Sequence, residues 1–263
     1  MLIICNGAFK SGSTWLHAIV EGILEIRGVA LAEIPVRYGP KSSPVSRLKE
    51  STLADFVEAE DLDSKHYLTK AHFFSEILLR TSYPANVKFL FIERDLRDAI
   101  VSHYHHFTIY RKWRLSFEVY YYLVGRYKAY EIWLFNERCK KYFPSDLFFN
   151  YAEMKRDCRA AIHRLCSILE LEPLTTEEED RVIAVTSLDA MRKNAAEGDR
   201  RFYPETGSDN EKLFRKGKVG EYKEYFSERS LADIDEIMNG RFSLVGRSFY
   251  GLLFTLRRRI TYS

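Results

Sequence analysis

The sequence predicts an α/β fold in which a central parallel sheet is flanked by helices within a single domain, residues 1–263. Two observations support this prediction. Short apolar runs bounded by turn residues alternate with segments of helical periodicity, which is typical of parallel α/β layers. The chain has 263 residues, of which 46% are hydrophobic, so it can bury the core of one large domain.

The expected elements follow this alternation along the chain. Each apolar run is expected to form a strand that a helix follows. The strands are residues 2–6, 66–70, 88–93 and 146–150, and the helices lie near 14–27, 74–82, 96–107 and 152–170. Aromatic side chains on a broad apolar face predict a longer helix over 116–142. From about residue 171 onward short helices are expected, and TTEEED at 175–180 is typical of a capped, acid-rich helix start.

Three segments fall outside this pattern. Residues 36–50 and 195–213 are polar and contain glycine and proline, so they are expected to form mobile loops over the active site, with plain surface connections as the alternative. Residues 242–259 are apolar, but Arg247 and two glycines interrupt them. They are therefore interpreted as a packed C-terminal helix rather than a membrane span.

The composition argues against several classes of protein. Lys+Arg 40 against Asp+Glu 37 leaves a net charge of +3, which is too balanced for binding nucleic acid through its phosphate backbone. The four cysteines form no CxxC pair, which argues against a disulfide framework or a zinc site and favours a reducing compartment. No basic leader and no stretch long enough to cross a membrane follows Met1, so a cytoplasmic location is expected.

Residues 6–16, NGAFKSGSTWL, lie between the first strand and the first helix and are similar to a phosphate-binding loop. Backbone amides and the dipole at a helix start favour an anion. The Walker pattern GxxxxGK[ST] requires lysine at position 13, but Ser13 and Thr14 follow Gly12 here, and the lysine is Lys10. Three interpretations are open: a degenerate nucleoside-triphosphate site, an accidental turn, or a phosphate-binding loop for another donor. The displaced lysine disfavours the nucleoside-triphosphate site.

The stretch KSGSTWL after an apolar strand resembles the 5′-phosphosulfate loop, PKSGTTW, of the sulfotransferases that use 3′-phosphoadenosine 5′-phosphosulfate (PAPS). Phe9 replaces the proline and Ser13 replaces one threonine, which leaves the charge, the glycine and the indole in place. The resemblance implies a P-loop-NTPase-like (sulfotransferase) fold. It also implies that the donor is bound by Lys10, Ser11, Gly12, Ser13, Thr14 and Trp15.

A second stretch, FLFIERDLRDAIVSHYHHF at 89–107, is similar to the family's strand–loop–helix element RNPxDxxVSxY. By this match Arg94 and Ser102 would hold the 3′-phosphate of the donor, the arginine through a charge-assisted fork and the serine through its hydroxyl. Taken alone, Arg94 could equally form a salt bridge with one of the neighbouring acids, Glu93, Asp95 or Asp98.

A third stretch, FRKGKVGEYKEYF at 214–226, is similar to the family's RKGxxGDWK element. The match implies that Arg215, Lys216 and Gly217 complete the 3′-phosphate site, with an exposed basic turn as the alternative. Weaker matches link NYAEMKRD to YEDMK and VTSLDAMRKN to SSFxxMKxN. They imply that Trp15, Tyr151 and Thr186 line the adenine, although each could be an ordinary core or cap residue.

The segment HYLTKAHFF at 66–74 resembles the family's KTHLP segment, whose histidine is the general base. Lys70 and His72 lie on the same side of an extended segment. The resemblance implies that His72 takes the proton of the acceptor hydroxyl, while Lys10 and Lys70 stabilise charge on the bridging oxygen and on the sulfonate. Ala71 replaces the threonine, so this match is the least faithful of the main ones.

No metal is expected in this reaction, because the migrating group carries little net charge and lysine and arginine supply the neutralisation. His103 and His106 are one helical turn apart within SHYHH, which suggests a metal site. No carboxylate or cysteine completes a ligand set in the sequence, so a packed or solvated helix face is the preferred interpretation.

The expected function is transfer of a sulfuryl group from PAPS to an acceptor hydroxyl, with an amine as the second choice, and release of adenosine 3′,5′-bisphosphate (PAP). The alternatives are a P-loop small-molecule kinase and a catalytically inactive nucleotide-binding protein of the same fold. A small hydroxylated metabolite is the expected acceptor, and an acidic carbohydrate is the alternative. Aromatic residues could line an apolar pocket for the metabolite: Phe73, Phe74, Tyr104, Phe107, Tyr110 and Trp113. Cationic residues could bind the carbohydrate: Arg37, Lys41, Arg111 and Lys112. The sequence does not determine the oligomeric state.

Overall fold

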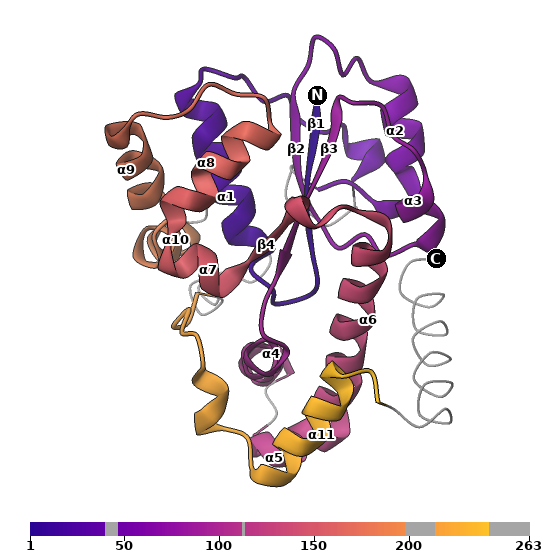
Figure 1. Ribbon diagram of the computed structural model, residues 1–263, viewed down its shortest axis with the longest axis vertical. Coiled ribbons are helices and arrows are strands. Elements are labelled where there is room, and N and C mark those ends of the chain that lie inside the picture. Colours follow the sequence, from indigo (N-terminus) through magenta and orange to yellow (C-terminus); the bar gives the residue numbers. More distant parts are fainter. Residues whose placement is uncertain (40–46, 112–113, 198–213, 242–263) are drawn as a thin grey trace. The chain divides into compact units, whose positions relative to one another are not determined.

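The computed structural model describes residues 1–39, 47–111, 114–197 and 214–241 (Figure 1). The chain divides into two compact units. The first consists of Met1–Arg94 and Arg138–Lys218, and the second of Asp95–Glu137 and Val219–Ser263. Among the described residues, no helix is both long enough and apolar enough to cross a bilayer.

The first unit contains a four-stranded parallel sheet in the order β2-β1-β3-β4. The strands are β1 (Leu2–Gly7), β2 (Tyr67–Ala71), β3 (Val87–Glu93) and β4 (Phe148–Asn150). All four predicted strands are present. The expected start at residue 146 is wrong, because residues Ser145–Leu147 form a 3-10 turn, η4, before β4.

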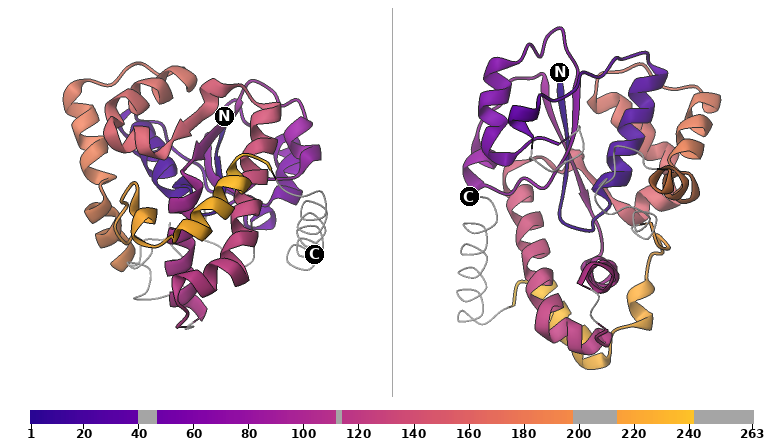
Figure 2. Two further views of the ribbon diagram at one scale, coloured as in Figure 1. Left: turned by 60° about the horizontal axis from the view of Figure 1, so that its bottom comes forward. Right: turned by 180° about the vertical axis from the view of Figure 1, so that it is seen from behind.

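Helices cover both faces of this sheet. Figures 1 and 2 show α1 (Ser13–Ile26), α8 (Cys158–Ile168) and α9 (Thr176–Val185) on one side, and α2 (Leu53–Ala59) and α3 (Glu76–Arg80) on the other. Every residue of β1 is buried, because it lies between two neighbouring strands and under helices on both faces. A core cluster joins this strand to apolar residues of α1, α8 and α9.

Two predicted helices differ from the observed ones. The helix expected over 152–170 is two helices, α7 (Tyr151–Arg156) and α8, because the Asp157 carboxylate accepts a hydrogen bond of 3.0 Å from the Ala160 amide and starts a new helix. The helix expected over 74–82 is the shorter α3. At the start of α8 a local polar group determines the helix boundary, which apolar periodicity does not record.

The segments expected to be loops are only partly described. Residues 40–46 and 198–213 lie outside the described residues, as do 242–259. The remainder of 36–50 contains the short turns η1 (Val36–Tyr38) and the start of η2 (Glu50–Thr52). Its Leu48 is buried, and the Leu48 amide donates a hydrogen bond of 3.1 Å to the Thr69 hydroxyl of β2. This part of the segment is therefore fixed to the sheet.

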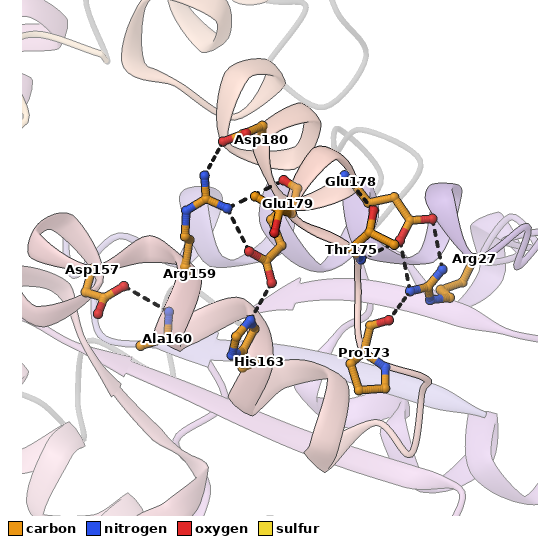
Figure 3. Close-up of polar contacts among 11 residues, drawn as sticks. Arg27, Asp157, Arg159, Ala160, His163, Pro173, Thr175, Glu178, Glu179 and Asp180 are labelled. Carbon is orange, nitrogen blue, oxygen red and sulfur yellow. Dashed lines mark hydrogen bonds and ion pairs between the residues drawn. The ribbon is translucent and has the colours of Figure 1, made fainter.

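Polar contacts bind α9 to its neighbours (Figure 3). Thr175 begins the helix with a capping box, in which its hydroxyl accepts from the Glu178 amide and its own amide donates to the Glu178 carboxylate. Arg27, at the end of α1, donates to the same carboxylate at 3.1 Å. Arg159 and His163 of α8 both donate to the buried Glu179 carboxylate. The predicted capped helix start at 175–180 is thus confirmed.

The second unit is helical in its described part. It contains α4 (Leu96–Arg111), α5 (Phe117–Tyr120), the π-helical turn η3 (Tyr121–Gly125), most of α6 (Arg126–Tyr142), η6 (Glu221–Glu224) and α11 (Glu228–Met238). The long helix expected over 116–142 is present as the consecutive segments α5, η3 and α6. Its Tyr120 and Tyr121 are fully buried, so the aromatic residues there belong to the core, as expected.

Candidate active site

The loop between β1 and α1 has a backbone that few sequences can adopt. Lys10 and Gly12 both have left-handed backbone angles, with φ of 68° and 107°. The Ser11 amide and the Ser11 hydroxyl both donate to the Ala8 carbonyl, at 3.1 and 2.7 Å, which closes the turn. Helix α1 then begins at Ser13 with no side-chain cap. Its first amides are therefore available to an anion, as the amides of phosphate-binding loops are.

Lys10 lies in this loop with other positive charges around it. Burial lowers the pKa of its ammonium group to about 8, and the charges of Arg94 and Arg215 lower it further. Three cations that repel one another in a partly desolvated place raise the energy of the ligand-free protein. An anion bound among them would relieve that repulsion.

The end of β2 lies beside the same loop. β1 pairs with β2 in parallel, so that Cys5 is opposite Lys70 and Asn6 is opposite Ala71. The Lys70 ammonium group donates a hydrogen bond of 2.9 Å to the Thr14 hydroxyl in the first turn of α1. Burial lowers the pKa of Lys70 to about 7, and the charges of Arg47 and Lys10 act in the same direction.

His72 follows β2 directly. Its Nδ1–H donates a hydrogen bond of 2.6 Å to the Gly7 carbonyl oxygen. Because a carbonyl oxygen only accepts, Nδ1 carries the hydrogen of the neutral ring and Nε2 carries the lone pair. Part of the side chain is accessible to solvent, yet the surrounding protein displaces enough water to lower the pKa of the imidazole to about 4. The bond to Gly7 opposes that shift, and the charges of Lys70, Arg47 and Lys10 add to it.

Arg94 follows β3 and lies on the face of Tyr151. The guanidinium carbon is 4.5 Å from the centre of the tyrosine ring, and Nη2 donates to the Lys218 carbonyl at 2.8 Å. The acids considered as salt-bridge partners each have other contacts. Glu93 pairs with Lys140, Asp95 pairs with Arg97, and Asp98 accepts from the Gly220 and Tyr222 amides.

Tyr151, at the start of α7, contacts several of the predicted site residues. The Trp15 ring packs edge-on against it at a centroid distance of 5.4 Å. A Cβ atom on Gly12 would lie 2.7 Å from Tyr151 Cδ2, and one on Gly217 would lie 3.1 Å from Tyr151 Oη. Both glycines also have left-handed backbone angles. Only glycine allows the first loop and the segment after Phe214 to approach this tyrosine so closely.

The predicted RKG segment is fixed by a residue that the sequence did not single out. Arg192 of α10 (Leu188–Ala196) donates to the Phe214 carbonyl at 3.1 and 2.9 Å and to the Arg215 carbonyl at 2.8 Å. Arg215 and Gly217 are half-buried, and Lys216 is exposed. Arg192 lies within VTSLDAMRKN, a segment already matched to the family, which is the signal that could have found it.

The remaining predicted residues are not placed in this group by a described contact. Ser102 is half-buried on α4, in the second unit. Thr186 is buried at the end of α9, and its hydroxyl donates to the Val182 carbonyl at 2.7 Å, which is an ordinary helix-end contact. Their proposed donor contacts stay predictions.

The histidines of SHYHH belong to the second unit. His103 is buried and bonds to the Tyr120 hydroxyl through Nδ1, while His105 Nε2 bonds to the Tyr225 hydroxyl at 2.9 Å. Across the described ranges, no group of three or more histidines, cysteines or acids has a geometry suited to a metal ion.

Several acceptor candidates can also be located. Phe73 and Phe74 are buried, and Arg37 pairs with Glu60 at 3.1 Å. Tyr104 and Phe107 pack against Tyr120 inside the second unit. Lys41, Lys112 and Trp113 lie outside the described residues, and nothing is described of the side chains of Tyr110 and Arg111.

Known sulfotransferases share the sequence pattern of this chain. Sulfotransferase 1E1 of Rattus norvegicus is 26% identical to it over 230 residues, which cover 83% of this chain and 76% of that protein. Flavonol 4′-sulfotransferase of Flaveria chlorifolia is 25% identical over 265 residues, covering 90% of this chain and 78% of that protein.

Solved structures show the same fold. Mouse sulfotransferase SULT7A1 complexed with PAP has a TM-score of 0.66 at 21% identity and covers 94% of this chain and 86% of its own. Retinol dehydratase in complex with retinol and PAP has a TM-score of 0.60 at 14% identity, and the match covers 91% of this chain and 80% of its own. The predicted fold class is therefore confirmed.

The model of the sulfotransferase domain matches residues 2–246. Since that range includes nearly the whole chain and all the motifs quoted above, the chain belongs to the sulfotransferase family and is an enzyme of the sulfotransferase class, EC 2.8.2.

Proposed function

We propose that this sulfotransferase takes the sulfuryl group of PAPS and transfers it to a hydroxyl of a small acceptor, with an amine as the second choice, by in-line displacement with His72 as the general base. Distant homology supports PAPS as the donor, because the solved relatives include complexes with PAP. A single domain over residues 1–263 and a cytoplasmic location remain part of the proposal. Cytosolic sulfotransferase 11 of Arabidopsis thaliana, 24% identical over 271 residues, supports the latter.

One observation carries the proposal: cations and an uncapped helix start converge at the carboxyl ends of β1 and β2. Lys10, Lys70 and the first amides of α1 lie there, and the Lys70–Thr14 hydrogen bond joins the two motifs. Arg94 and Arg215 contribute to the positive potential at Lys10. This arrangement fits a donor that carries one anionic group on its 5′ side and a second phosphate at its 3′ position.

The glycines at Tyr151 support the same donor. Gly12 and Gly217 allow the backbone of two separate segments to approach one aromatic ring. Trp15 and Arg94 contact that ring from other sides. An adenine base would be held beside Trp15 and Tyr151, between the two groups of cations. PAPS supplies a sulfuryl group on a mixed anhydride, whose leaving oxygen requires neutralisation.

The chain's own residues then have defined tasks. The Nε2 lone pair of His72 takes the proton of the acceptor hydroxyl, because Nδ1 is committed to Gly7. A pKa of about 4 keeps the free imidazole neutral at physiological pH, so the base is in its active form. Lys10 and Lys70 stabilise the charge that develops on the bridging oxygen and on the sulfonate oxygens.

The names of the relatives support a small hydroxylated acceptor. They include flavonol sulfotransferases of Flaveria, and retinol dehydratase was solved with retinol and with androsterone. The family membership also argues against the small-molecule kinase that the sequence left open. The inactive nucleotide-binding protein remains as the alternative that an assay has to exclude.

The test has a binding part and a transfer part. In a thermal-shift screen, PAP is expected to raise the melting temperature at concentrations where ATP with Mg²⁺ and adenosine 5′-phosphosulfate do not. In a mass-spectrometric assay with PAPS and a panel of phenols and alcohols, the wild-type chain is expected to form sulfated product and PAP. His72→Ala is expected to lose turnover while it still binds PAP. Full turnover by His72→Ala would show that the base is another group.

A further inference from the structure

Asn6 is a polar side chain in the middle of an apolar strand. It occupies the next-to-last position of β1, and its exposed fraction is 0%. Its neighbours in the strand, from Leu2 to Cys5, are all apolar. A buried amide costs free energy unless both of its ends are hydrogen-bonded, so this residue requires a structural or functional reason.

Both ends of the Asn6 side chain bond to the backbone of one residue, Phe73. The Phe73 amide donates to Asn6 Oδ1 at 2.8 Å, and Asn6 Nδ2 donates to the Phe73 carbonyl at 3.1 Å. The main-chain ladder between β1 and β2 ends two residues before Phe73, at the pair Asn6–Ala71. The side chain therefore extends the pairing of the two strands past the point where the ladder stops. This pair of contacts is called the Asn6 clamp below.

The residue between the ladder and the clamp is His72. Its backbone is held by the pair at Ala71 on one side and by the clamp at Phe73 on the other. Its ring is held by the carbonyl of Gly7, the residue that follows Asn6. Two consecutive residues of β1 thus fix the main chain and the imidazole of the same histidine.

A second contact supports the segment that follows. The Phe74 and Ser75 amides both donate to the Glu50 carboxylate. Without the clamp, residues 74–75 would therefore still be hydrogen-bonded to Glu50. The displacement would be concentrated at His72 and Phe73, where it bears on the position of the imidazole.

We propose that Asn6 is a positioning residue, which acts through His72 by holding the histidine's backbone at the end of β2. This inference rests on the proposed role of His72 as the general base. Proton transfer depends on heavy atoms held within hydrogen-bond reach, and a misplacement of about 1 Å can lower a rate by about 10²-fold. Removing the clamp thus lowers kcat without removing any group that touches the donor.

The first test compares Asn6→Ala with the wild-type chain. The kcat is expected to fall by about 10²-fold, while the KM for PAPS and the Kd for PAP change by less than about 2-fold. Thr175→Ala is the matched control, since it removes a capping side chain from α9 and is expected to destabilise the fold by a similar amount while leaving kcat unchanged. Equal loss of kcat in both variants would overturn the proposal, as would an unchanged kcat in Asn6→Ala.

A double-mutant cycle separates positioning from general destabilisation. If Asn6 acts through His72, adding Asn6→Ala to His72→Ala is expected to leave the residual rate unchanged. If the two substitutions acted independently, their losses of rate would multiply. That result would contradict the positioning role of Asn6. His72→Ala alone tests the proposed function, so full activity of that variant would overturn the base assignment. Loss of activity in His72→Ala together with full activity in Asn6→Ala would overturn only the clamp.

Asn6→Asp provides a second variant of nearly the same volume. Its ionised carboxylate accepts from the Phe73 amide but has no hydrogen for the Phe73 carbonyl, whereas the protonated acid can make both bonds. The kcat relative to wild type is therefore expected to rise as the pH falls through the pKa of the new carboxyl group. A ratio that stays constant over that range, or that falls, would contradict the proposal.

Discussion

The Lys70 ammonium group donates a hydrogen bond of 2.9 Å to the Thr14 hydroxyl, although 56 positions separate the two residues in the chain. Thr14 lies in the first turn of α1, and Lys70 is the next-to-last residue of β2. The parallel pairing of β1 with β2 brings the carboxyl ends of both strands to one edge of the sheet. The loop that we propose binds the donor and the segment that we propose is catalytic are far apart in sequence, yet they lie side by side at this edge.

Lys70→Met is expected to lower kcat by about 10²- to 10³-fold, because it removes a preorganised charge from the oxygen atoms that gain charge during transfer. Lys65→Met, at an exposed position shortly before β2, removes the same charge without reaching the site and is the control. Initial-rate measurements with saturating PAPS give the comparison. Equal rates in Lys70→Met and the wild type would remove Lys70 from the catalytic group.

PAP binding is expected to take up protons at pH 8. Burial and neighbouring positive charges lower the pKa of Lys70 to about 7 and that of Lys10 to about 8, so both are partly neutral in the free protein at that pH. A bound anion favours their charged forms and raises both pKa values. Calorimetric titrations in buffers of different ionisation enthalpy measure the uptake. Lys70→Met and Lys10→Met should each reduce it, and a net proton release would contradict the assignment.

The same two lysines determine a trend in the stability of the free protein. Their folded pKa values are below the ordinary value of 10.5, so the unfolded chain binds more protons between about pH 7 and 10.5. Their contribution to the free energy of unfolding therefore increases as the pH rises through this range. Urea unfolding at a series of pH values measures this trend. The free energy of unfolding of Lys10→Met and of Lys70→Met, relative to that of the wild type, should fall as the pH rises. Parallel curves would argue against the lowered pKa values.

Gly12→Ala is expected to destabilise the fold more than Gly28→Ala does. Both glycines have left-handed backbone angles, with φ of 107° and 68°, so both substitutions introduce strain of about 1–3 kcal/mol. Only at Gly12 would the new methyl group also meet Tyr151, 2.7 Å from Cδ2, whereas no atom lies within 4 Å at Gly28. Urea unfolding measures the difference, for which overpacking predicts about 1–3 kcal/mol.

Tyr151→Leu in the Gly12→Ala background should recover part of this difference, because it removes the ring that the methyl group meets. Identical losses of stability at Gly12 and Gly28 would show that the loop can move away from Tyr151 at little cost.

Glu179→Ala is expected to lower the free energy of unfolding by about 1–3 kcal/mol and to leave kcat unchanged. The Glu179 carboxylate is 5% exposed and accepts from Arg159 and His163, so its loss removes two partly buried polar contacts between α8 and α9 (Figure 3). Asp180→Ala is the control. That carboxylate is 61% exposed, and its pairing with Arg159 should contribute less than about 1 kcal/mol. Equal effects in the two variants would contradict this interpretation.

The strands of the sheet and their parallel direction were largely predictable because local patterns specify them. The apolar runs at 2–6, 66–70 and 88–93 form buried parallel strands, and the glycine-containing turn after the first leads into a helix. The errors occurred at the boundaries of elements. Asp157 divides one expected helix into two by capping the second, and residues 145–147 form a turn instead of the start of β4.

The residues of the candidate site were predicted from motifs, but several residues that support them in the structure were not. In the sequence, Asn6 is the last residue of a predicted strand, and Leu48 lies in a segment predicted to be a polar loop. Arg192 is one of 40 lysines and arginines. Their contacts are to backbone atoms of Phe73, Phe214 and Arg215, and to the Thr69 hydroxyl. Every residue except proline offers the same backbone groups, so no sequence pattern marks Phe73, Phe214 or Arg215 as a partner.

Residue patterns were enough to predict the class of fold, a phosphate loop with a displaced lysine, and the cations and the histidine that match the motifs of the sulfotransferase family. Those features depend on residues close together in the chain and on side-chain chemistry that is unusual at such spacing. The three-dimensional structure was needed to show that Lys70 contacts Thr14 and that Tyr151 lies against Gly12 and Gly217. It was also needed to show that Asn6 bonds to the backbone of Phe73 and that the Gly7 carbonyl fixes the lone pair of His72 on Nε2. Each of these depends on the order and register of parallel strands, which the packing of the whole sheet fixes and which no short segment encodes.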